Sequence, residues 1–451
     1  MEKYHNLFQT LINSYQAGTF ENTVKNIFND SHYNKQKLAG IVSALCGVDI
    51  VYTNVDEYIT DLKYAIKNYK GISHVVKKIS PCSAHCVDED GASKCKIYCP
   101  FDAIIHDRER RDLIIDPLKC TDCGQCVDQC ENGNFVDKIE YLPLQELLKE
   151  NRKVIIAVAP AIAGQFGSDV TLEKLRTAFL KIGFIDMVEV AFFADILTLK
   201  EAVEFNKKVK SKEDFLITSC CCPMWIGMLK KVYSQFIKDT SPSISPMIAA
   251  GRIIKKLNPD YKVVFVGPCV AKKAEAKEKD VIGDIDFVLT FEELKNIFEA
   301  CNMTLSQLPE TPSSEYASKD GRLYARTGGV SIAVSDTVEA LYPDKADKVR
   351  AIKAQGVQEC RQVLNNLKEG KIEGNFIEGM GCTGGCVGGP KALIPASKGK
   401  EFVDNAAYSS AVKLTVHNEC MQSILEQIGI SGVDDFINEE HTDMFIRDFD
   451  K

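Results

Sequence analysis

Hydrophobic residues recur along this 451-residue chain in three different patterns. In residues 1–75 they follow helical spacing, as in segments 6–15, 22–30 and 55–70, which predicts a small helical N-terminal region. Residues 76–140 are polar and hold too few apolar side chains for an ordinary hydrophobic core. Something else must organise them, and metal clusters can do so. From residue 150 onward, short apolar runs alternate with amphipathic segments. This order predicts three domains, at residues 1–75, 76–140 and 141–451.

The third domain has the alternation of strands and helices that is typical of layered proteins. Strands are expected at residues 153–160, 187–194, 214–219, 261–267 and 285–290, with a weaker candidate at 375–380. Helices are expected at residues 171–183, 197–210, 225–237, 247–258 and 291–300. A surface loop is expected at 308–321. The pattern predicts an α/β and α+β multidomain protein with mainly parallel sheets.

Composition narrows the class of partner. Apolar residues make up 45% of the chain and charged residues 26%, as in globular proteins. The net charge of -8 argues against nucleic acid and anionic membranes, and mildly favours a cationic partner surface. No apolar run is long enough to span a bilayer, and the N-terminus has neither a signal peptide nor a twin-arginine pattern. We therefore expect a cytoplasmic protein.

Eighteen cysteines point to metal or thiol chemistry, because disulfides are unusual in a reducing compartment. Eight of them form two spaced groups in residues 82–130. Two-residue spacings suit a [4Fe-4S] cluster whose fourth ligand comes from the other group. We expect one cluster on Cys82, Cys86, Cys95 and Cys130, and another on Cys99, Cys120, Cys123 and Cys126. Two structural zinc sites are the alternative, and the even spacing favours iron-sulfur clusters and electron transfer.

Three further cysteine signatures lie in the third domain. They are residues 218–225 (TSCCCPMW), 267–275 (GPCVAKKAE) and 378–389 (EGMGCTGGCVGG), and each follows an expected strand. Ligands of open α/β sheets bind beyond the carboxyl ends of strands, so the three segments can converge. The glycines around Cys382 and Cys386 let the backbone approach a bulky cofactor. One thiolate from each of the first two signatures and two from the third would complete a third cubane.

These signatures, in this order behind a two-cluster segment, resemble those of [FeFe]-hydrogenases over residues 80–390. The triple cysteine resembles the divergent group B or M2-type branch. The resemblance implies a ferredoxin-like 2[4Fe-4S] domain followed by a two-lobed H-cluster domain. It also implies a cubane whose Cys386 bridges to a diiron subsite with CO, cyanide and azadithiolate, with Lys272 bonding a cyanide. The implied cubane ligands are Cys222, Cys269, Cys382 and Cys386.

The resemblance also implies a proton route. Cys221 matches the family's relay thiol, whose pKa suits proton transfer. Glu201 and Glu204 share a helix face and match relay carboxylates, with Ser241 between them. Solvated glutamates on a helix surface are the ordinary alternative. Cys220 is extra, and a small buried apolar role is favoured for it over a redox role.

Several positions around the implied cofactor differ from the family's best-studied branch. Gly267 stands in place of methionine, Ala161 in place of serine and Met247 in place of glutamine, while Pro160 and Met380 are retained. Such changes tune potential and catalytic bias but leave the cluster ligands intact. Glu275 matches a family glutamate and is expected to be a structural partner. Four cysteines have no ligand partner at useful spacing and are expected to be core or surface thiols: Cys46, Cys301, Cys360 and Cys420.

The function that the resemblance implies is the reversible reaction 2H⁺ + 2e⁻ ⇌ H₂. Electrons would pass through three [4Fe-4S] clusters to or from ferredoxin, and maturation proteins would build the diiron subsite. No nucleotide fingerprint indicates NAD. A non-catalytic iron-sulfur assembly or electron-transfer relative is the second hypothesis, and a hydrogen sensor is the third. The residues after 391 are expected to pack as short helices rather than as a signalling domain.

Overall fold

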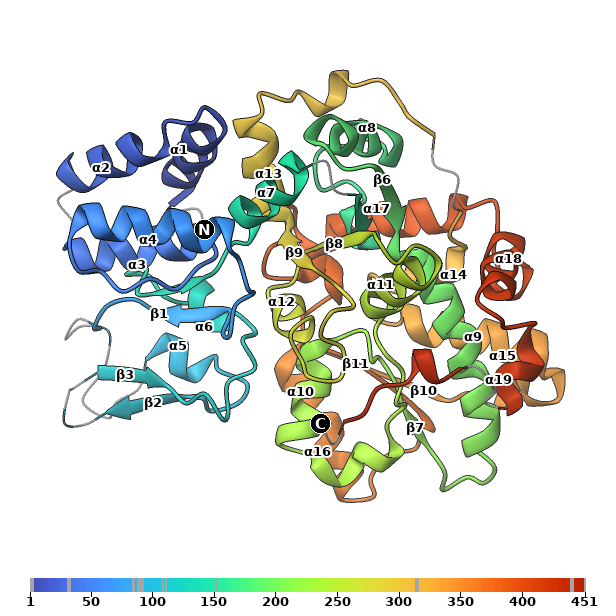
Figure 1. Ribbon diagram of the computed structural model, residues 1–451. Coiled ribbons are helices and arrows are strands. Elements are labelled where there is room, and N and C mark those ends of the chain that lie inside the picture. Colours follow the sequence, from blue (N-terminus) through green and yellow to red (C-terminus); the bar gives the residue numbers. More distant parts are fainter. Residues whose placement is uncertain are drawn as a thin grey trace. The chain divides into compact units, whose positions relative to one another are not determined.

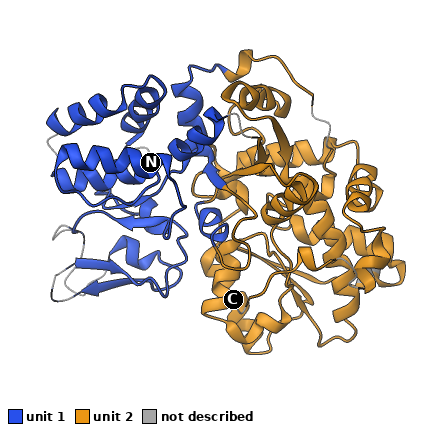
Figure 2. Cartoon of the chain, in the orientation of Figure 1, with its two compact units in different colours: residues 1–152, 270–277, 287–304 blue, residues 153–269, 278–286, 305–451 orange. Residues whose placement is uncertain are grey.

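The computed structural model describes residues 4–30, 34–82, 86, 93–107, 109, 112–150, 153–312, 316–438 and 442–449 (Figure 1). The chain forms two compact units, coloured separately in Figure 2. Unit 1 contains residues 1–152, 270–277 and 287–304, and unit 2 contains residues 153–269, 278–286 and 305–451. Within these described ranges, no helix is long and apolar enough to cross a membrane.

Unit 1 begins with four helices, as the helical spacing predicts: α1 (His5–Gln16), α2 (Phe20–Asp30), α3 (Lys35–Leu45) and α4 (Val55–Lys67). The expected segments 6–15 and 22–30 lie within α1 and α2, the segment 55–70 forms α4 but its helix ends at Lys67, and α3 is an additional helix. The side chains of Asn34 and Asn54 accept hydrogen bonds from first-turn N–H groups of α3 and α4, which fixes where these helices begin. Cys46 follows α3 and is fully buried, as expected for a core thiol.

The cysteine-rich part of unit 1 consists of short elements. Strand β1 (Val76–Lys78) pairs antiparallel with β4 (Phe135–Asp137), and β2 (Ile104–Asp107) pairs antiparallel with β3 (Asp112–Ile115). Two four-residue helices carry cysteines between the strands: α5 (Lys94–Ile97) and α6 (Gln125–Asp128). The other elements of unit 1 are α7 (Tyr141–Lys149), α12 (Ala271–Glu275), β9 (Phe287–Thr290) and α13 (Phe291–Ala300).

Unit 2 contains two sets of parallel strands. Strand β5 (Val154–Val158) lies between β6 (Asp186–Glu189) and β8 (Lys262–Gly267), parallel to both. In a second sheet, β11 (Phe376–Met380) lies between β10 (Ala351–Gln355) and β7 (Leu216–Ile217), again parallel. The side chains of β5 and β11 are all buried. The predicted α/β and α+β class is therefore confirmed, and buried parallel strands explain the continuous apolar runs.

One predicted strand is wrong in its second half. The expected strand 187–194 ends at Glu189, and helix α9 (Val190–Lys208) begins at the next residue. Fifteen of the nineteen residues of α9 are buried. A helix that is buried on nearly all sides has no amphipathic period, so its apolar start cannot be told from a buried strand by pattern alone.

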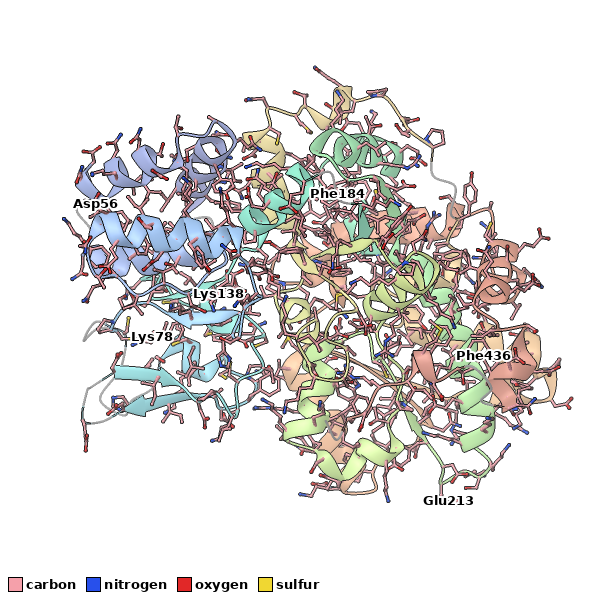
Figure 3. All side chains as sticks on the ribbon, viewed as in Figure 1. Asp56, Lys78, Lys138, Phe184, Glu213 and Phe436 are labelled. Atoms are coloured by element: carbon pink, nitrogen blue, oxygen red, sulfur yellow. The ribbon has the colours of Figure 1, made fainter. Side chains whose placement is uncertain are left out.

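Helices complete unit 2 around the two sheets: α8 (Leu172–Ile182), α10 (Pro223–Lys231), α11 (Pro246–Leu257), α14 (Lys319–Leu323), α15 (Gly329–Leu341) and α16 (Gly356–Lys368). The predicted loop at 308–321 is three residues too long, because α14 begins at Lys319, and its residues 313–315 lie outside the described residues. The C-terminal segment forms α17 (Ala396–Ser409), α18 (Glu419–Gln427) and α19 (Val433–Asn438), of which α17 is longer than the short helices expected. Phe436 of α19, labelled in Figure 3, lies 5.8 Å from Phe445 between ring centres.

Candidate active site

The cysteine signatures of unit 2 follow the carboxyl ends of three strands, as the sequence predicts. Cys222 comes after β7 and immediately precedes α10, Cys269 follows β8, and Cys382 follows β11. The backbone N–H of Gly381 lies 3.2 Å from the Sγ of Cys222 and donates to it. This bond joins the first signature to the third. Amide donors of this kind stabilise thiolates and tune the potential of iron-sulfur clusters.

The second signature lies against the third. The N–H of Lys391 donates to the carbonyl of Pro268 at 3.0 Å. A Cβ atom on Gly389 would lie 2.7 Å from that carbonyl oxygen and 3.0 Å from the carbonyl oxygen of Cys386. The glycine is therefore needed for the close approach of the two ligand loops, as the sequence predicts for this glycine-rich segment.

The turn at Ser219 separates the three consecutive cysteines. Ser219 has φ +67°, in the left-handed region that serine seldom adopts, and its buried Oγ has no hydrogen-bond partner among the described residues. Cys220 Sγ donates to the carbonyl of Ser241 at 2.9 Å, whereas Cys222 accepts from Gly381. Cys221 packs in a buried apolar cluster that contains Tyr324. Each thiol of the triplet thus has its own environment, and strain of this kind gathers at functional sites.

The chain's one tryptophan supports this turn. Trp225 is fully buried in α10, and its Nε1 donates to the carbonyl of Thr218 at 2.9 Å. A Cβ atom on Gly379 of β11 would lie 2.2 Å from the indole ring, so the glycine makes room for it. The indole ring therefore links the end of β7, just before the three cysteines, to the neighbouring strand β11.

Glu201 of α9 is fully buried and the Glu204 side chain is 12% exposed, so neither is a solvated surface glutamate. Ser241 Oγ donates to Glu204 Oε2 at 2.6 Å, the contact that the resemblance implies. Glu201 instead accepts a hydrogen bond from the hydroxyl of Thr218. Lys208 Nζ, at the more exposed end of α9, lies 2.9 Å from the second oxygen of Glu204. The polar contacts of Glu201 and those of Glu204 thus form two separate groups along an otherwise apolar helix.

The two carboxyl groups have opposite electrostatic surroundings. Burial raises the pKa of Glu201 to about 7, with the Thr218 hydroxyl opposing it and the charge of Glu204 adding to it. Burial also acts on Glu204, but the charges of Lys200 and Lys208 and the Ser241 hydroxyl outweigh it and lower the pKa of Glu204. A carboxyl group that titrates near neutral pH, next to an ionised one, is suited to proton transfer.

Tyr324 lies near both Cys221 and Glu201. Burial raises the pKa of its hydroxyl well above the ordinary value, and the charges of Glu201 and Cys221 add to the effect, so both groups are close to it. Its hydroxyl lies 2.9 Å from the Oγ1 of Thr198. Nothing in the spacing of the sequence marks Tyr324, which reaches the site from α14's carboxyl end.

The third signature is anchored by a buried carboxylate. Glu378, in β11, accepts hydrogen bonds from the N–H groups of Gly328 and Ser331 at 2.6 and 2.8 Å and from the Ser331 hydroxyl. These donors belong to the N-terminal turn of α15, which favours a negative charge. Burial nevertheless raises the pKa of Glu378. The carboxylate therefore fixes the strand that leads to Cys382 and Cys386.

The remaining predicted cofactor-binding residues of unit 2 are at strand or helix ends. Pro160 and Ala161 lie in a short helical turn after β5, Gly267 ends β8, Met247 is the second residue of α11 and Met380 ends β11. A Cβ atom on Gly267 would lie 2.7 Å from the ring of Phe265. The ring of Phe265 on the same strand therefore leaves no room for a side chain at position 267. The family pattern by itself does not indicate this constraint.

Lys272 and Glu275 are in α12, which belongs to unit 1. Lys272 Nζ lies 2.6 Å from Glu275 Oε2, and both residues are buried. The structure thus gives Glu275 the position of a partner that holds the lysine. A buried ammonium with a fixed partner can serve as a directed donor to an anionic ligand.

Several thiols of the cysteine-rich part of unit 1 lie near one another. Burial raises the pKa of Cys126 well above its ordinary value, and the nearby Cys123, Cys120 and Cys99, and also Cys95, add to the shift. Cys95 is in turn influenced by Cys130. Within the described residues, no three His, Cys, Asp or Glu side chains are arranged to ligate a single metal ion.

Hydrogen bonds to these sulfurs support a cluster environment. Backbone N–H groups donate to Cys99, Cys120 and Cys130 at 3.3, 3.4 and 3.1 Å. The side-chain amide of Asn132 donates to Cys86 at 2.7 Å. Donors to several sulfurs within one small region fit thiolates that bind iron.

Two models of known protein families match parts of the chain. A family model described as "iron only hydrogenase large subunit, C-terminal domain" matches residues 152–390, more than half of the chain, and a 4Fe-4S binding domain matches residues 113–135. The chain therefore belongs to the iron-only hydrogenase large-subunit family and has an iron-sulfur-binding region, so the resemblance is confirmed at this level.

Its relatives include both enzymes and proteins named for cluster assembly. Iron hydrogenase 1 of Clostridium pasteurianum is 29% identical over 439 residues, covering 75% of this chain and 76% of that protein. The periplasmic [Fe] hydrogenase large subunit of Nitratidesulfovibrio vulgaris is 26% identical, covering 70% and 89%. Cytosolic iron-sulfur assembly component 3 of Rattus norvegicus is also 26% identical, covering 63% and 73%. Sequence identity alone therefore does not separate the two functions.

A solved structure extends the comparison to the fold. An apo [FeFe]-hydrogenase of Chlamydomonas reinhardtii aligns with a TM-score of 0.55 at 20% identity, covering 67% of this chain and 97% of that one. At this identity the likeness supports the fold alone. Both the fold and the family are thus shared with hydrogenases.

Proposed function

We propose that the protein is an [FeFe]-hydrogenase that catalyses 2H⁺ + 2e⁻ ⇌ H₂. The observation that carries the proposal is the partly buried contact between Ser241 and Glu204, 2.6 Å long, on the same helix as the fully buried carboxyl group of Glu201. A buried carboxylate costs free energy unless it is paired, and Glu201 has a hydroxyl donor rather than a cation as its hydrogen-bond partner. A path for protons has no purpose in a protein that only holds or transfers a cluster.

The proposed cofactor is a [4Fe-4S] cubane joined to a diiron subsite with CO, cyanide and azadithiolate. Cys222, Cys269, Cys382 and Cys386 would hold it, with Cys386 shared between its two parts. When bound, the group would supply the redox-active iron at which H₂ is made or split. The amide donor at Cys222 and the glycines of the third signature fit such a bulky anionic group.

This chain's own residues would move the proton. Cys221, buried beside Tyr324, would exchange a proton with the cofactor, and Glu201 would take it up because its pKa lies close to neutral pH. Ser241 would pass a proton to Glu204, which Lys208 connects to the more exposed end of α9. Lys272, held by Glu275, would donate a hydrogen bond to a cyanide.

Two further [4Fe-4S] clusters on the cysteines of residues 82–130 would carry electrons to or from ferredoxin or a similar carrier. Dedicated maturation proteins would insert the diiron subsite. The proposed division into residues 1–75, 76–140 and 141–451 gives these tasks separate segments. A cytoplasmic location agrees with free thiols such as that of the exposed Cys420, because thiols are oxidised in an oxidising compartment.

Cluster assembly is the second candidate, because relatives named for that role are as similar as some hydrogenases. Infrared spectroscopy of the matured protein separates the two. Bands of metal-bound CO and cyanide that shift under H₂ are expected for the hydrogenase. Protein with full iron content and no such bands, after maturation that succeeds on a known hydrogenase, would refute the proposal and favour assembly or electron transfer.

A further inference from the structure

Four side chains beside the proposed relay form a closed ring of polar contacts. Lys200 Nζ lies 2.8 Å from Ser243 Oγ, which lies 2.8 Å from Ser241 Oγ. Ser241 Oγ lies 2.6 Å from Glu204 Oε2, and Lys200 Nζ closes the ring at 3.4 Å from the same oxygen. The two serines are fully buried, and Lys200 is 8% exposed. Neither Lys200 nor Ser243 is marked by the spacing of the relay residues.

The chemistry of the donors gives the ring one direction. An ammonium group has three donors and no acceptor, so Ser243 must accept from Lys200. Ser243 then directs its own proton to Ser241, and Ser241 directs its proton to Glu204. The backbone N–H of Ser243 lies 3.4 Å from Ser241 Oγ and also donates to it, so both lone pairs of Ser241 are engaged by Ser243. The hydroxyl that donates to Glu204 is therefore oriented by Ser243 and, through it, by a lysine two contacts away.

We propose that Lys200 and Ser243 are a positioning arm of the relay, which points the Ser241 hydroxyl at Glu204 and keeps Glu204 as an ionised proton acceptor. The arm contains none of the proposed cofactor ligands, and its lysine acts through Ser243 and through its charge. The use of the arm in hydrogen turnover rests on the proposed function. The direction of the hydrogen bonds in the ring is independent of that function.

The charges around Glu204 come from few groups. Lys200 and Lys208 act on it from α9 itself, and Ser241 acts on it from the segment between η3 (Ser234–Asp239) and α11. Glu201 on α9 and the thiol of Cys220 are near enough for Glu204 to raise their pKa values. Lys200 is the more enclosed of the two cations, so solvent screens it less.

The first test measures protonation of Glu204 without hydrogen turnover. The full chain, carrying its [4Fe-4S] clusters but no diiron subsite, is titrated by infrared difference spectroscopy of the protonated carboxyl stretch, and Glu204→Gln identifies the band. We expect Lys200→Met to move protonation of Glu204 upward by about one to three pH units, because an opposite charge at this distance favours the ionised form by that amount. Lys200→Arg should titrate like the wild type.

A matched control comes from the same helix. Lys207 is on α9 but donates to the carbonyl of Phe436, so Lys207→Met should leave the Glu204 band in place. An unchanged titration in Lys200→Met, with the protein folded by circular dichroism, would overturn the proposal. A shift in Lys207→Met as large as that in Lys200→Met would also overturn it.

The second test follows turnover in the matured protein. Ser243→Ala should lower turnover about tenfold or more and change its pH profile, while the CO and cyanide bands stay as in the wild type, because only the hydroxyl orientation is lost. Unaltered turnover and pH profile would refute the arm's role in the relay. A matured wild type without turnover, in which Lys200→Met still shifts the Glu204 band, would refute the proposed function and leave the ring intact.

Discussion

Replacing Glu201 by glutamine should make the protein more stable at alkaline pH while it stops proton transfer. The carboxyl group is fully buried, and burial raises its pKa from 4.5 to about 7. The folded protein therefore binds this proton more tightly than the unfolded chain. Stability is lost as pH rises through the window from about 4.5 to about 7. Glutamine has no charge to bury and still offers an oxygen to the Thr218 hydroxyl.

The magnitude follows from the pKa. One pKa unit corresponds to about 1.4 kcal/mol, so the ionised carboxylate costs the fold about 3 kcal/mol at about pH 8 and less than about 1 kcal/mol at about pH 5. For a unit of this size, we expect the melting temperature of Glu201→Gln to exceed that of the wild type by about 5 °C at about pH 8. At about pH 5 the two melting temperatures should be close.

Scanning calorimetry under anaerobic conditions, with equal cluster content, measures the effect. Glu204→Gln is the matched control, because Lys200 and Lys208 lower the pKa of Glu204 and its ionised form stabilises the fold. That variant should be less stable than the wild type near neutral pH, the opposite sign to Glu201→Gln. Parallel pH dependences of melting for the wild type and Glu201→Gln would refute the assignment of a buried, near-neutral carboxyl at position 201.

Three further variants test the thiols. Cys382→Ala should lose about four iron atoms per chain and all hydrogen turnover, measured by iron analysis and gas chromatography, whereas unchanged iron content would contradict its role as a ligand. Cys221→Ala should keep the CO and cyanide bands but lose turnover by about a hundredfold or more, and full turnover would exclude it from the relay. Cys220→Ser should retain turnover because its hydroxyl can still donate to the carbonyl of Ser241, whereas Cys220→Ala should lower it several-fold; equal activity of the two would favour the simple apolar role.

Much of the candidate site could be predicted from cysteine spacing. The intervals and the resemblance predict twelve cysteine ligands; in the structure Cys130 is near Cys95, and the thiols near Cys126 are those of Cys123, Cys120, Cys99 and Cys95. The expected strand ends before Cys222, Cys269 and Cys382 are also present. Such features are local in sequence, because a strand, its end and the ligand after it occupy adjacent residues.

The sequence also determined the α/β class, the family and the pairing of two glutamates on one helix face, since period and spacing are written along the chain. The tertiary structure alone decided that α9 begins at Val190, that Ser219 takes a left-handed turn, and that Lys200 meets Ser243 across 43 residues. Burial on all sides erases the helical period, and a contact between distant segments leaves no interval to count. Hydrogen bonds and charges act through space, and only the folded chain fixes those distances.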